Sequence, residues 1–364
     1  WRFFVDSRKD MYGVDSAILM NPKVWEASGH VGGFSDPMVE CEKCKRRFRE
    51  DQLPARSDPR SDLKDWKQVR PEKGSLLCPE CGGKLGEMRQ FNMMFKTHVG
   101  PVADWASVSY LRPETAQGMF VNFKNVIDSF HPKLPFGIAQ VGKAFRNEIA
   151  PRDFTFRARE FEIMEFEYFI REEEWGKQFA YWQSEMMRWI KAVGIDSGHV
   201  HEVKVPKEEL AHYSRRTTDL YFDFPFGQKE LYGLAYRTDF DLKSHSEASG
   251  VKLEYSDEET KTPITPHVIE PTFGLDRTVL AVLASAYTED EMNGDKRVYL
   301  KLKPDIAPIK VAVFPLLKNK PELVKKATEV HQLLCSMFHG ACSMVAFDDN
   351  GNIGKRYRRQ DEIG

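Results

Sequence analysis

The stretch from residue 137 to 169 constrains the fold most, because two β-type runs in it flank a loop rich in arginine. A strand places every second side chain on the same face. On the first run, one face carries small residues followed by a cation and an anion, namely Gly142, Ala144, Arg146 and Glu148. On the second run, one face carries an aromatic ring, an aliphatic side chain and a carboxylate, namely Phe161, Ile163 and Glu165. The pattern predicts a long β-hairpin whose small residues leave room for a ligand.

The loop between the two runs carries Arg152, Arg157 and Arg159, more guanidinium groups than a half-buried hairpin needs. Arginine forks match the oxygens of phosphate groups. A carboxylate can accept from the exocyclic amine of a base, and an aromatic ring can stack on that base. The combination predicts a site for a nucleoside polyphosphate. A solvated hairpin with surface salt bridges is the alternative, because such pairs are common and weak.

Length and composition indicate the class of protein. A chain of 364 residues is long enough for two or three domains with a large core. Hydrophobic residues at 41% and charged residues at 30% are typical of a soluble globular protein. The net charge of −2 means that a nucleic-acid partner would have to use local basic patches. No apolar run approaches the ~18 residues that a membrane span requires.

The chain opens at Trp1 without a starting Met and stops at Gly364 without a tail signature. We therefore expect the natural protein to extend beyond both ends. No secretory signal is visible in the sequence, and we expect a cytoplasmic location.

Four of the six cysteines form two CxxC pairs, Cys41 with Cys44 and Cys78 with Cys81. Around them, from about residue 36 to 90, apolar periodicity fades. This predicts an insertion that folds poorly without a cross-link such as a bound metal ion. Paired CxxC knuckles in a chain without a secretory signal favour thiolate ligands over disulfides. We predict a tetrahedral Zn²⁺ held by the four sulfurs, with four reduced, solvent-facing thiols as the alternative.

Two charged residues near predicted helix starts suggest ligand roles. Glu114 follows Pro113 in a segment too polar for a core strand, and a place in the first turn of a helix, where the macrodipole favours a carboxylate, is the alternative. Arg277 lies in the first turn of a helix predicted to begin after Gly274, where a cation opposes the macrodipole. Its presence indicates an anionic partner such as a triphosphate, which helix-start amides would also favour.

The run from residue 229 to 242 combines strand alternation with charge. Arg237, Asp239 and Asp241 cluster at its end. Carboxylates near a phosphate site are candidate Mg²⁺ ligands, because that ion prefers oxygen and bridges through phosphates. A mutual ion pair of Arg237 with Asp239 is the alternative.

The remaining pattern predicts the elements around these sites. Aromatic residues at steps of three and four predict an amphipathic helix over 172–194, which Gly194 would end. We also expect a polar loop over 243–262 and a strand over 266–273. After these come a strand over 309–317, a helix over 321–338 and a strand over 342–347. The last three predict the start of a small parallel α/β domain after residue 304.

Several specific motifs now point to one family: SGHVGGFSDPM, RPETAQGMFVNFKN, FRNE with REFEIMEFEYF, ELYGLAYRTDFDL and EPTFGLDR. Over nearly its whole length the chain resembles the glycyl-tRNA synthetases of dimeric bacterial and eukaryotic type, which are class II aminoacyl-tRNA synthetases. The resemblance implies an α+β fold with an antiparallel sheet of six to seven strands flanked by helices, rather than a Rossmann domain. Residues 137–169 are then class II motif 2, residues 270–277 motif 3, and residues 1–15 the tail of motif 1.

The resemblance also implies a domain plan and partners. Residues 1–304 would form the catalytic domain, with a zinc-knuckle insertion over 37–90 and a helical and β insertion over 172–228. Residues 305–364 would be part of an anticodon-binding domain. The implied partners are glycine, ATP with Mg²⁺, and tRNA(Gly), in a homodimer without membrane contact.

Carried over by position, the resemblance assigns an ATP site. Arg146 would hold the α-phosphate, Glu148 the adenine amine and Arg277 the γ-phosphate, while Phe161 would stack near adenine and Glu230 would contact Mg²⁺. The whole implied set is Arg146, Asn147, Glu148, Phe156, Arg157, Ala158, Arg159, Glu160, Phe161, Glu230, Leu231, Gly274, Leu275, Asp276 and Arg277. Catalytic roles would fall to Arg146, Arg277 and Glu230.

The resemblance assigns the glycine ammonium group to Glu114, Glu165 and Glu270. The whole implied glycine set is Arg49, Glu114, Phe161, Glu162, Ile163, Met164, Glu165, Arg237, Glu270, Pro271, Thr272, Phe273 and Gly274. Thr272 stands where the bacterial family usually has serine, and it keeps the hydroxyl group. Asp276 stands where class II motif 3 usually has a second glycine.

The implied chemistry is attack by the glycine carboxylate on the α-phosphate of ATP. That carboxylate is already ionised at neutral pH, so no general base is needed, and no convincing Ser/His/Asp or Cys/His set is present. One methyl group in an attractive pocket discriminates only by roughly 10–200-fold, so alanine would have to be excluded by a clash. The alternatives are a class II synthetase for serine, threonine or proline, and an inactive paralogue that serves as a binding subunit.

Overall fold

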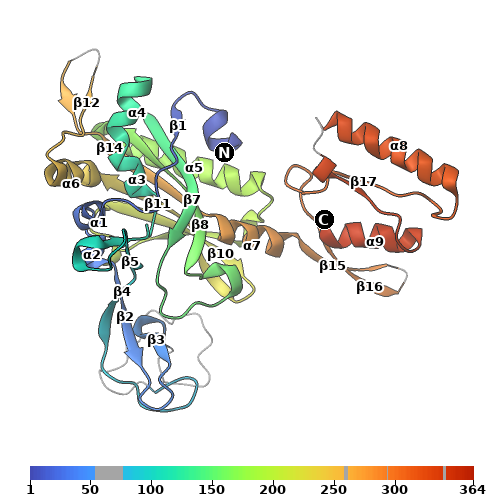
Figure 1. Ribbon diagram of the computed structural model, residues 1–364, viewed down its shortest axis with the longest axis horizontal. Helices are drawn as coiled ribbons and strands as arrows, with labels where there is room; N and C mark the ends of the chain where they lie inside the picture. The colour runs from blue at the N-terminus through green and yellow to red at the C-terminus, as the bar shows by residue number, and fades with distance from the viewer. Residues whose placement is uncertain (54–76, 258–260, 293, 339–341) are drawn as a thin grey trace. The chain divides into compact units, whose positions relative to one another are not determined.

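The computed structural model describes residues 1–53, 77–257, 261–292, 294–338 and 342–364. The predicted insertion over 37–90 therefore lies partly outside the described residues. Among the described residues, the largest feature is a seven-stranded sheet that contains both runs of the predicted hairpin (Figure 1).

The sheet has the strand order β1–β7–β8–β14–β11–β10–β9. Its strands are β1 (Met11–Gly13), β7 (Phe136–Phe145), β8 (Glu160–Ile170), β9 (Val200–Lys204), β10 (Arg216–Phe224), β11 (Gly227–Thr238) and β14 (His267–Gly274). β1 joins β7 in parallel, whereas β8 pairs antiparallel with β7 and β14, and β14 pairs antiparallel with β11. The predicted hairpin is β7–β8, and an α+β fold with a mostly antiparallel sheet is confirmed.

The chain divides into two compact units that do not follow chain order. The first contains Trp1–Phe179, Lys204–Thr218 and Tyr232–Asp276, and the second contains Ala180–Val203, Asp219–Leu231 and Arg277–Gly364. The predicted domain boundary after residue 304 and the insertion over 172–228 stay predictions.

Short helices and an aromatic core hold the hairpin in the first unit. These helices are α1 (Pro22–Ala27), α2 (His30–Gly33), α3 (Ala116–Val121), α4 (Phe123–Phe130) and α6 (Phe240–Ser249). α3 contacts both β7 and β8. The ring centres of Phe123 and Phe169 lie 4.7 Å apart and those of Phe136 and Phe169 5.2 Å, and all three rings are fully buried. This packing fixes the two long strands against the helices.

Three small sheets complete the first unit. β2 (Ser35–Glu40) lies between β3 (Arg47–Arg49) and β4 (Arg89–Asn92), β5 (Lys96–His98) pairs with β6 (Val108–Tyr110), and β12 (Tyr255–Ser256) pairs with β13 (Pro263–Ile264). The first CxxC pair begins where β2 ends, so this sheet supports the cysteines.

The second unit ends in the predicted parallel α/β element. The second unit contains most of α5 (Trp175–Ala192) and of α7 (Leu275–Ala286). The elements that follow α7 are β15 (Tyr287–Met292), β16 (Asp295–Leu300), β17 (Val311–Val313), α8 (Pro321–Met337), β18 (Val345–Phe347) and α9 (Ile353–Ile363). β17 and β18 pair in parallel around α8, which confirms the predicted βαβ start. The strand predicted over 309–317 is too long, because Pro315 has no N–H to donate to a ladder. No helix among the described residues is both long and apolar enough to cross a bilayer.

The predicted amphipathic helix is confirmed as α5. Its aromatic stripe packs inward, with Phe179, Trp182 and Met186 fully buried. Gly194 adopts a φ of +79° just past the helix end, a conformation that favours glycine.

The loop predicted over 243–262 is wrong at its beginning, because α6 continues to Ser249. The sequence of α6 has little apolar periodicity, so no local pattern predicts this helix. Leu242 and His245 are buried in it and Asp241 is paired with Arg237. Tertiary contacts therefore override a weak local preference.

Candidate active site

One face of β8 and β14 carries the carboxylates that the resemblance assigned to the ammonium group. The antiparallel register pairs Glu165 with Thr272, so the two side chains stand on the same face. Glu270 lies two residues before Thr272 and shares that face. Glu165 and Glu270 are buried, at 4% and 5% exposure. The sheet thus brings together two carboxylates that are far apart in the sequence.

Glu165 is held in place by three hydrogen-bond donors. The backbone N–H and the hydroxyl of Thr115 donate to Oε2 at 3.2 and 2.6 Å, and the hydroxyl of Thr272 donates to Oε1 at 2.9 Å. Burial raises the pKa of Glu165, the nearby Glu114 raises it further, and the two hydroxyls offset part of the rise. The donors fix the orientation of this carboxylate.

Glu114 lies just before α3, which begins at Ala116, and so precedes the helix rather than lying in its first turn. His30 Nε2 lies 3.4 Å from Oε2, the amide of Gln117 donates to Oε1 at 2.9 Å, and Arg237 Nη2 is 4.0 Å from Oε1. Burial alone would raise the pKa of Glu114, but His30, followed by Arg237 and Gln117, holds it below its ordinary value. Glu114 is therefore a buried anion with its own partners.

Arg237 is the buried cation of the site, at 1% exposure. Its Nε and Nη2 each lie 2.8 Å from an oxygen of Asp241, and its Nη1 donates to Glu270 at 2.7 Å. The guanidinium carbon stacks 3.7 Å from the ring centre of Tyr213. Such a forked pair fixes both partners.

The structure corrects two predictions beside Arg237. Asp239 pairs with Lys243 at 2.5 Å and Arg237 pairs with Asp241, so the alternative of an ion pair between Arg237 and Asp239 is wrong. Both oxygens of Asp241 accept from Arg237, and one also accepts from the amide of Gln117 at 3.0 Å. Asp241 is buried and engaged, so it does not fit the predicted Mg²⁺ ligand.

Buried carboxyl groups outnumber buried guanidinium groups in this pocket. Burial raises the pKa of Glu270 to about 8 although Arg237 opposes the rise, and Glu165 and Glu114 add to it. Buried charges are costly unless they are paired. A cation of ammonium size would relieve this excess, which makes the pocket suited to an amino group.

Four residues of the predicted glycine set point to the opposite face of the sheet, namely Glu162, Met164, Pro271 and Phe273. Phe273 packs there against Phe4 and Tyr232, with ring centres 5.1 and 4.8 Å apart. Only their backbone atoms can take part in the pocket. Phe161, Ile163, Thr272 and Gly274 share the face of the carboxylates.

Arg146 lies immediately after β7 and next to the carboxylate pocket. Its Nε donates to the carbonyl of Pro113 at 3.1 Å, and Pro113 directly precedes Glu114. Its guanidinium carbon lies 5.4 Å from the ring centres of both Phe34 and Phe161. The structure therefore brings the predicted phosphate-binding arginine beside the predicted ammonium ligands.

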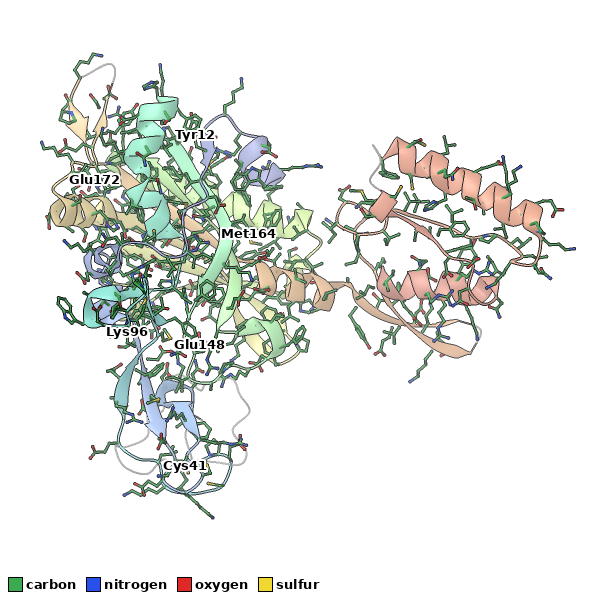
Figure 2. All side chains as sticks on the ribbon, viewed as in Figure 1. Tyr12, Cys41, Lys96, Glu148, Met164 and Glu172 are labelled. Carbon is green, nitrogen blue, oxygen red and sulfur yellow. The ribbon has the colours of Figure 1, made fainter. Side chains whose placement is uncertain are left out.

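The arginine-rich loop between β7 and β8 contacts Glu148, which lies beyond the end of β7 (Figure 2). Arg159 donates to the carbonyl of Glu148 from Nε and Nη2 at 3.2 and 3.0 Å, and Arg157 Nη1 lies 3.6 Å from its carboxylate. The N–H of Arg146 donates to the carbonyl of Arg159 at 2.9 Å and closes the loop. The other predicted members of this segment are Asn147, Phe156, Ala158 and Glu160.

Two details of the predicted hairpin face are wrong. β7 ends at Phe145, and the N–H of Glu148 donates to the carbonyl of Arg146 at 2.7 Å, so the backbone turns and the alternation stops. The space expected above Gly142 holds Arg112 rather than a ligand. A Cβ on Gly142 would lie only 2.4 Å from Arg112 Nη2.

The start of α7 carries Asp276 and Arg277. The carboxylate of Asp276 accepts from the N–H of Glu162 at 2.8 Å, which ties the start of α7 to β8. Arg277 Nη1 donates to the carbonyl of Glu230 at 2.9 Å and lies 3.2 Å from its half-exposed carboxylate. Leu231 is buried, so a ligand contact there would use backbone atoms.

Arg49 is engaged outside the carboxylate pocket. It lies on β3 and pairs with Asp36 at 2.7 Å and with Asp51 at 2.8 Å. Its role in binding glycine stays a prediction.

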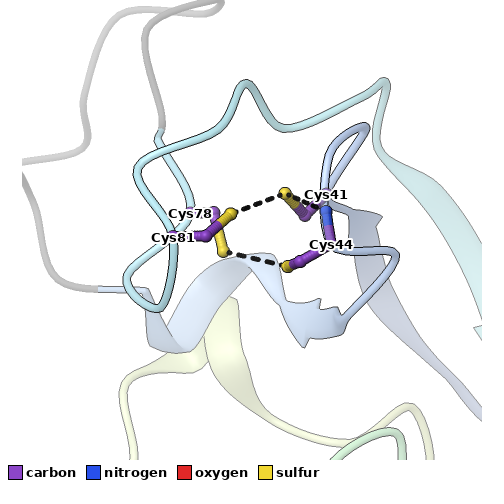
Figure 3. Close-up of side chains that lie close together, drawn as sticks. All are labelled: Cys41, Cys44, Cys78 and Cys81. Carbon is purple, nitrogen blue, oxygen red and sulfur yellow. Dashed lines mark hydrogen bonds between the residues drawn. The ribbon is translucent and has the colours of Figure 1, made fainter.

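The four cysteines of the two CxxC pairs face one another from two loops (Figure 3). Sγ of Cys41 lies 3.5 Å from that of Cys81, and Sγ of Cys44 lies 3.7 Å from that of Cys78. Zinc–sulfur bonds of about 2.3 Å in a tetrahedron place sulfurs about 3.8 Å apart. The N–H of Cys44 donates to Cys41 Sγ at 3.4 Å and lowers the pKa of Cys41, whereas burial and the neighbouring thiols raise the pKa of Cys44. The donor set fits zinc.

Sequence reasoning missed several residues that surround the carboxylates, namely His30, Thr115, Gln117, Tyr213 and Glu167. Most of them give no local signal, because side chains in turns and short helices follow no periodic rule. Glu167 is different, since the period of two that places Glu165 on one face of β8 places Glu167 there too.

Comparison with known proteins gives a consistent result. The family model of the class II tRNA synthetase core domain (G, H, P, S and T) matches residues 104–286. The chain is 47% identical over 374 residues to a glycine–tRNA ligase of Geobacillus thermodenitrificans (strain NG80-2), covering all of this chain and 78% of that relative. Glycine–tRNA ligases of Alkaliphilus metalliredigens (strain QYMF) and Thermobifida fusca (strain YX) are each 46% identical, with all of this chain and 79% of the relative covered.

Proposed function

The chain belongs to the glycine–tRNA ligase family of class II tRNA synthetases, and on that premise we propose how its residues act. The reaction joins glycine to ATP as glycyl-adenylate with release of pyrophosphate, and then transfers glycine to tRNA(Gly). The observation that carries the assignment of residues is the buried excess of carboxylates beside Arg146.

Glycine binds with its ammonium group against Glu114, Glu165 and Glu270. The three carboxylates come from the start of α3, from β8 and from β14, and the hydrogen bonds to Thr115 and Thr272 support their orientation. Each of the three carboxyl groups is held by hydrogen bonds to the protein, and exclusion of a substrate methyl group by a clash is part of the proposal. A clash would be needed to exclude alanine, because one extra methyl group in an attractive pocket changes the affinity only modestly.

ATP binds along the β7–β8 loop. Arg146 holds the α-phosphate, Glu148 accepts from the adenine amine, and Phe161 stacks on the base. The bond from Arg146 to the carbonyl of Pro113 supports this arrangement, because it places the arginine one residue from the ammonium ligand Glu114. The glycine carboxylate and the α-phosphate would then meet next to Arg146, which stabilises the charge that develops.

Arg277 at the start of α7 holds the γ-phosphate, and Glu230 contributes to the Mg²⁺ site. Class II synthetases use ATP with Mg²⁺, and the ion neutralises charge on the phosphates. The partly exposed carboxylate of Glu230 suits an ion that keeps several waters and binds mainly through phosphate oxygens. Backbone amides at the start of α7 add to the anion site.

We assign a structural zinc ion, which would stabilise the insertion, to Cys41, Cys44, Cys78 and Cys81. Their sulfur spacing supports this assignment, and Gly83 lets the backbone approach closely, since a Cβ there would lie 3.1 Å from Cys41 Sγ. The homodimer and the cytoplasmic location rest on the family resemblance and stay predictions.

An ATP–pyrophosphate exchange screen with single amino acids tests the proposed function. We expect exchange with glycine and none with alanine, serine, threonine or proline. Exchange with one of these in place of glycine would contradict the proposed pocket.

A further inference from the structure

Glu167 on β8 is a buried carboxyl group that the proposed reaction does not use. It is fully buried, and within the described residues neither of its oxygens has a hydrogen-bond partner. The antiparallel register that pairs Thr272 with Glu165 brings Glu167 opposite Glu270. One oxygen from each of Glu165, Glu167 and Glu270 lies within 4.8 Å of the others.

The three carboxyl groups differ in what stabilises a negative charge on them. Glu165 accepts from three donors, and Glu270 accepts from Arg237 at 2.7 Å. Glu167 has no such donor among the described residues and no access to water. A buried carboxylate without donors or a counter-charge is far more costly than the neutral acid. The geometry therefore places a proton on Glu167.

We propose that Glu167 is a neutral positioning residue of the glycine site, whose O–H donates to Glu270 and holds that carboxylate toward the bound ammonium group. Glu270 is the acceptor because it lies opposite in register, whereas Glu165 already accepts from three donors. The proposal depends on the glycine site proposed above. Burial raises the pKa of Glu167 well above its ordinary value, and Glu270 raises it further.

The proposal explains why a fourth acidic residue is tolerated beside three other buried carboxyl groups. The charged groups around it are Glu165, Asp241, Glu270 and Arg237. Arg237 is already shared between Asp241 and Glu270, so it cannot neutralise a further anion. As a neutral donor, Glu167 adds a hydrogen bond without adding charge.

Paired substitutions at Glu167 and Glu165 test the proposal in ATP–pyrophosphate exchange. Glu167→Gln keeps a neutral donor, Glu167→Leu removes the donor at similar volume, and Glu165→Gln and Glu165→Leu form the matched pair at an ionised ligand. We expect the glycine KM to rise about tenfold or more in Glu167→Leu, the effect of losing one hydrogen bond to a charged group. In Glu167→Gln the rise should stay below about threefold, with kcat changed less than KM in both. At Glu165, both variants should lose binding to a similar extent.

Two results would overturn the proposal. A glycine KM in Glu167→Gln as high as in Glu167→Leu would make Glu167 an anionic ligand of the ammonium group or of a metal ion. A glycine KM in Glu167→Leu equal to that of the unaltered chain would leave Glu167 without a role. An unchanged ATP KM shows that the active site of a variant is folded. If Glu167→Leu does not fold, the glycine KM of folded Glu167→Gln tests the proposal alone, and a high value contradicts it. The unaltered chain tests the proposed function separately, because its failure to exchange with glycine would remove the site itself.

Discussion

The carboxylate pocket and the cysteine knuckle are both clusters of ligand groups, but they are stabilised in opposite ways. In the pocket, the register of β8 against β14 fixes the anions, and the counter-charge of Arg237 is part of the protein. In the knuckle, the sulfurs come from two loops above a small core that includes Val39 and Leu85. Under the proposed zinc assignment, the counter-charge of its thiolates comes from the bound metal.

This difference predicts different responses to the loss of a ligand. A site fixed by a large sheet is organised before its substrate arrives, and substrate binding then costs little rearrangement. A site built from loops is organised by its ion, so that metal binding and local folding are the same event. The knuckle should therefore depend on its ligand far more than the pocket does.

Removal of the metal is expected to have the largest effect. A strong zinc chelator should unfold the region of β2, β3 and β4 around the cysteines, because structural zinc supplies folding free energy there. Hydrogen exchange followed by mass spectrometry measures this for each strand. Exchange in β7 and β8 is the internal control and should stay slow. Equal protection of β2 with and without chelator, or less than one zinc per chain in protein purified without added metal, would contradict the assignment.

Arg237→Met should destabilise the protein by about 3–5 kcal/mol, since it leaves Asp241 and Glu270 buried without their counter-charge. Urea unfolding measures the change. Arg358→Met is the matched control, because Arg358 forms an exposed pair with Glu362 at 3.0 Å on α9 and should change stability by at most about 1 kcal/mol. Similar values for the two variants would show that the pocket does not depend on its built-in cation.

Glu165→Ala should reduce glycine-dependent exchange by about 100-fold or more. It removes one partner of a buried charge contact, which typically costs about 2–5 kcal/mol, and it leaves the hydroxyls of Thr115 and Thr272 without their acceptor. Steady-state kinetics with varied glycine measure the loss. Thr272→Ser keeps the hydroxyl and should change the glycine KM by less than about threefold. An unaffected rate in Glu165→Ala would count against the pocket.

The smallest expected effect is a pH dependence that separates the two regions. Glu270, with a pKa of about 8, gains its charge as pH rises, so the glycine KM should fall by about threefold or more between pH 7 and 8.5. Glu270→Gln should remove this trend. Zinc binding should weaken in the opposite direction, as pH falls and the thiolates of the knuckle take up protons. A glycine KM that is flat in the unaltered chain over this range would contradict the raised pKa.

The regular parts of the fold could be predicted from the sequence. Alternation identified β7 and β8, aromatic spacing identified α5, and the last βαβ element followed from two apolar runs around a helical one. These patterns are local, and each reports which face of an element is buried. The helix α6 was missed because its contacts, not its own pattern, stabilise it.

The candidate site could be predicted only in part. Glu165 and Arg146 stood out as charged residues on patterned strands. The partners of these residues did not stand out, since Thr115 and His30 lie in segments without period and reach the pocket from other parts of the chain. The alternative ion pair of Arg237 with Asp239 was wrong for the same reason. Arg237 pairs with Asp241 instead, because α6 turns Asp241 toward it.

The sequence by itself determined which residue types were available and which of them shared a face. It determined the four cysteines of the knuckle, the alternation that puts Glu165 and Glu167 on one side of β8, and the motifs of a class II synthetase. Only the tertiary structure decided which carboxyl group is an anion and which is neutral. That choice depends on the donors that other segments of the described chain bring to Glu165 and Glu270 and do not bring to Glu167, because a buried group takes the protonation state that its neighbours can stabilise.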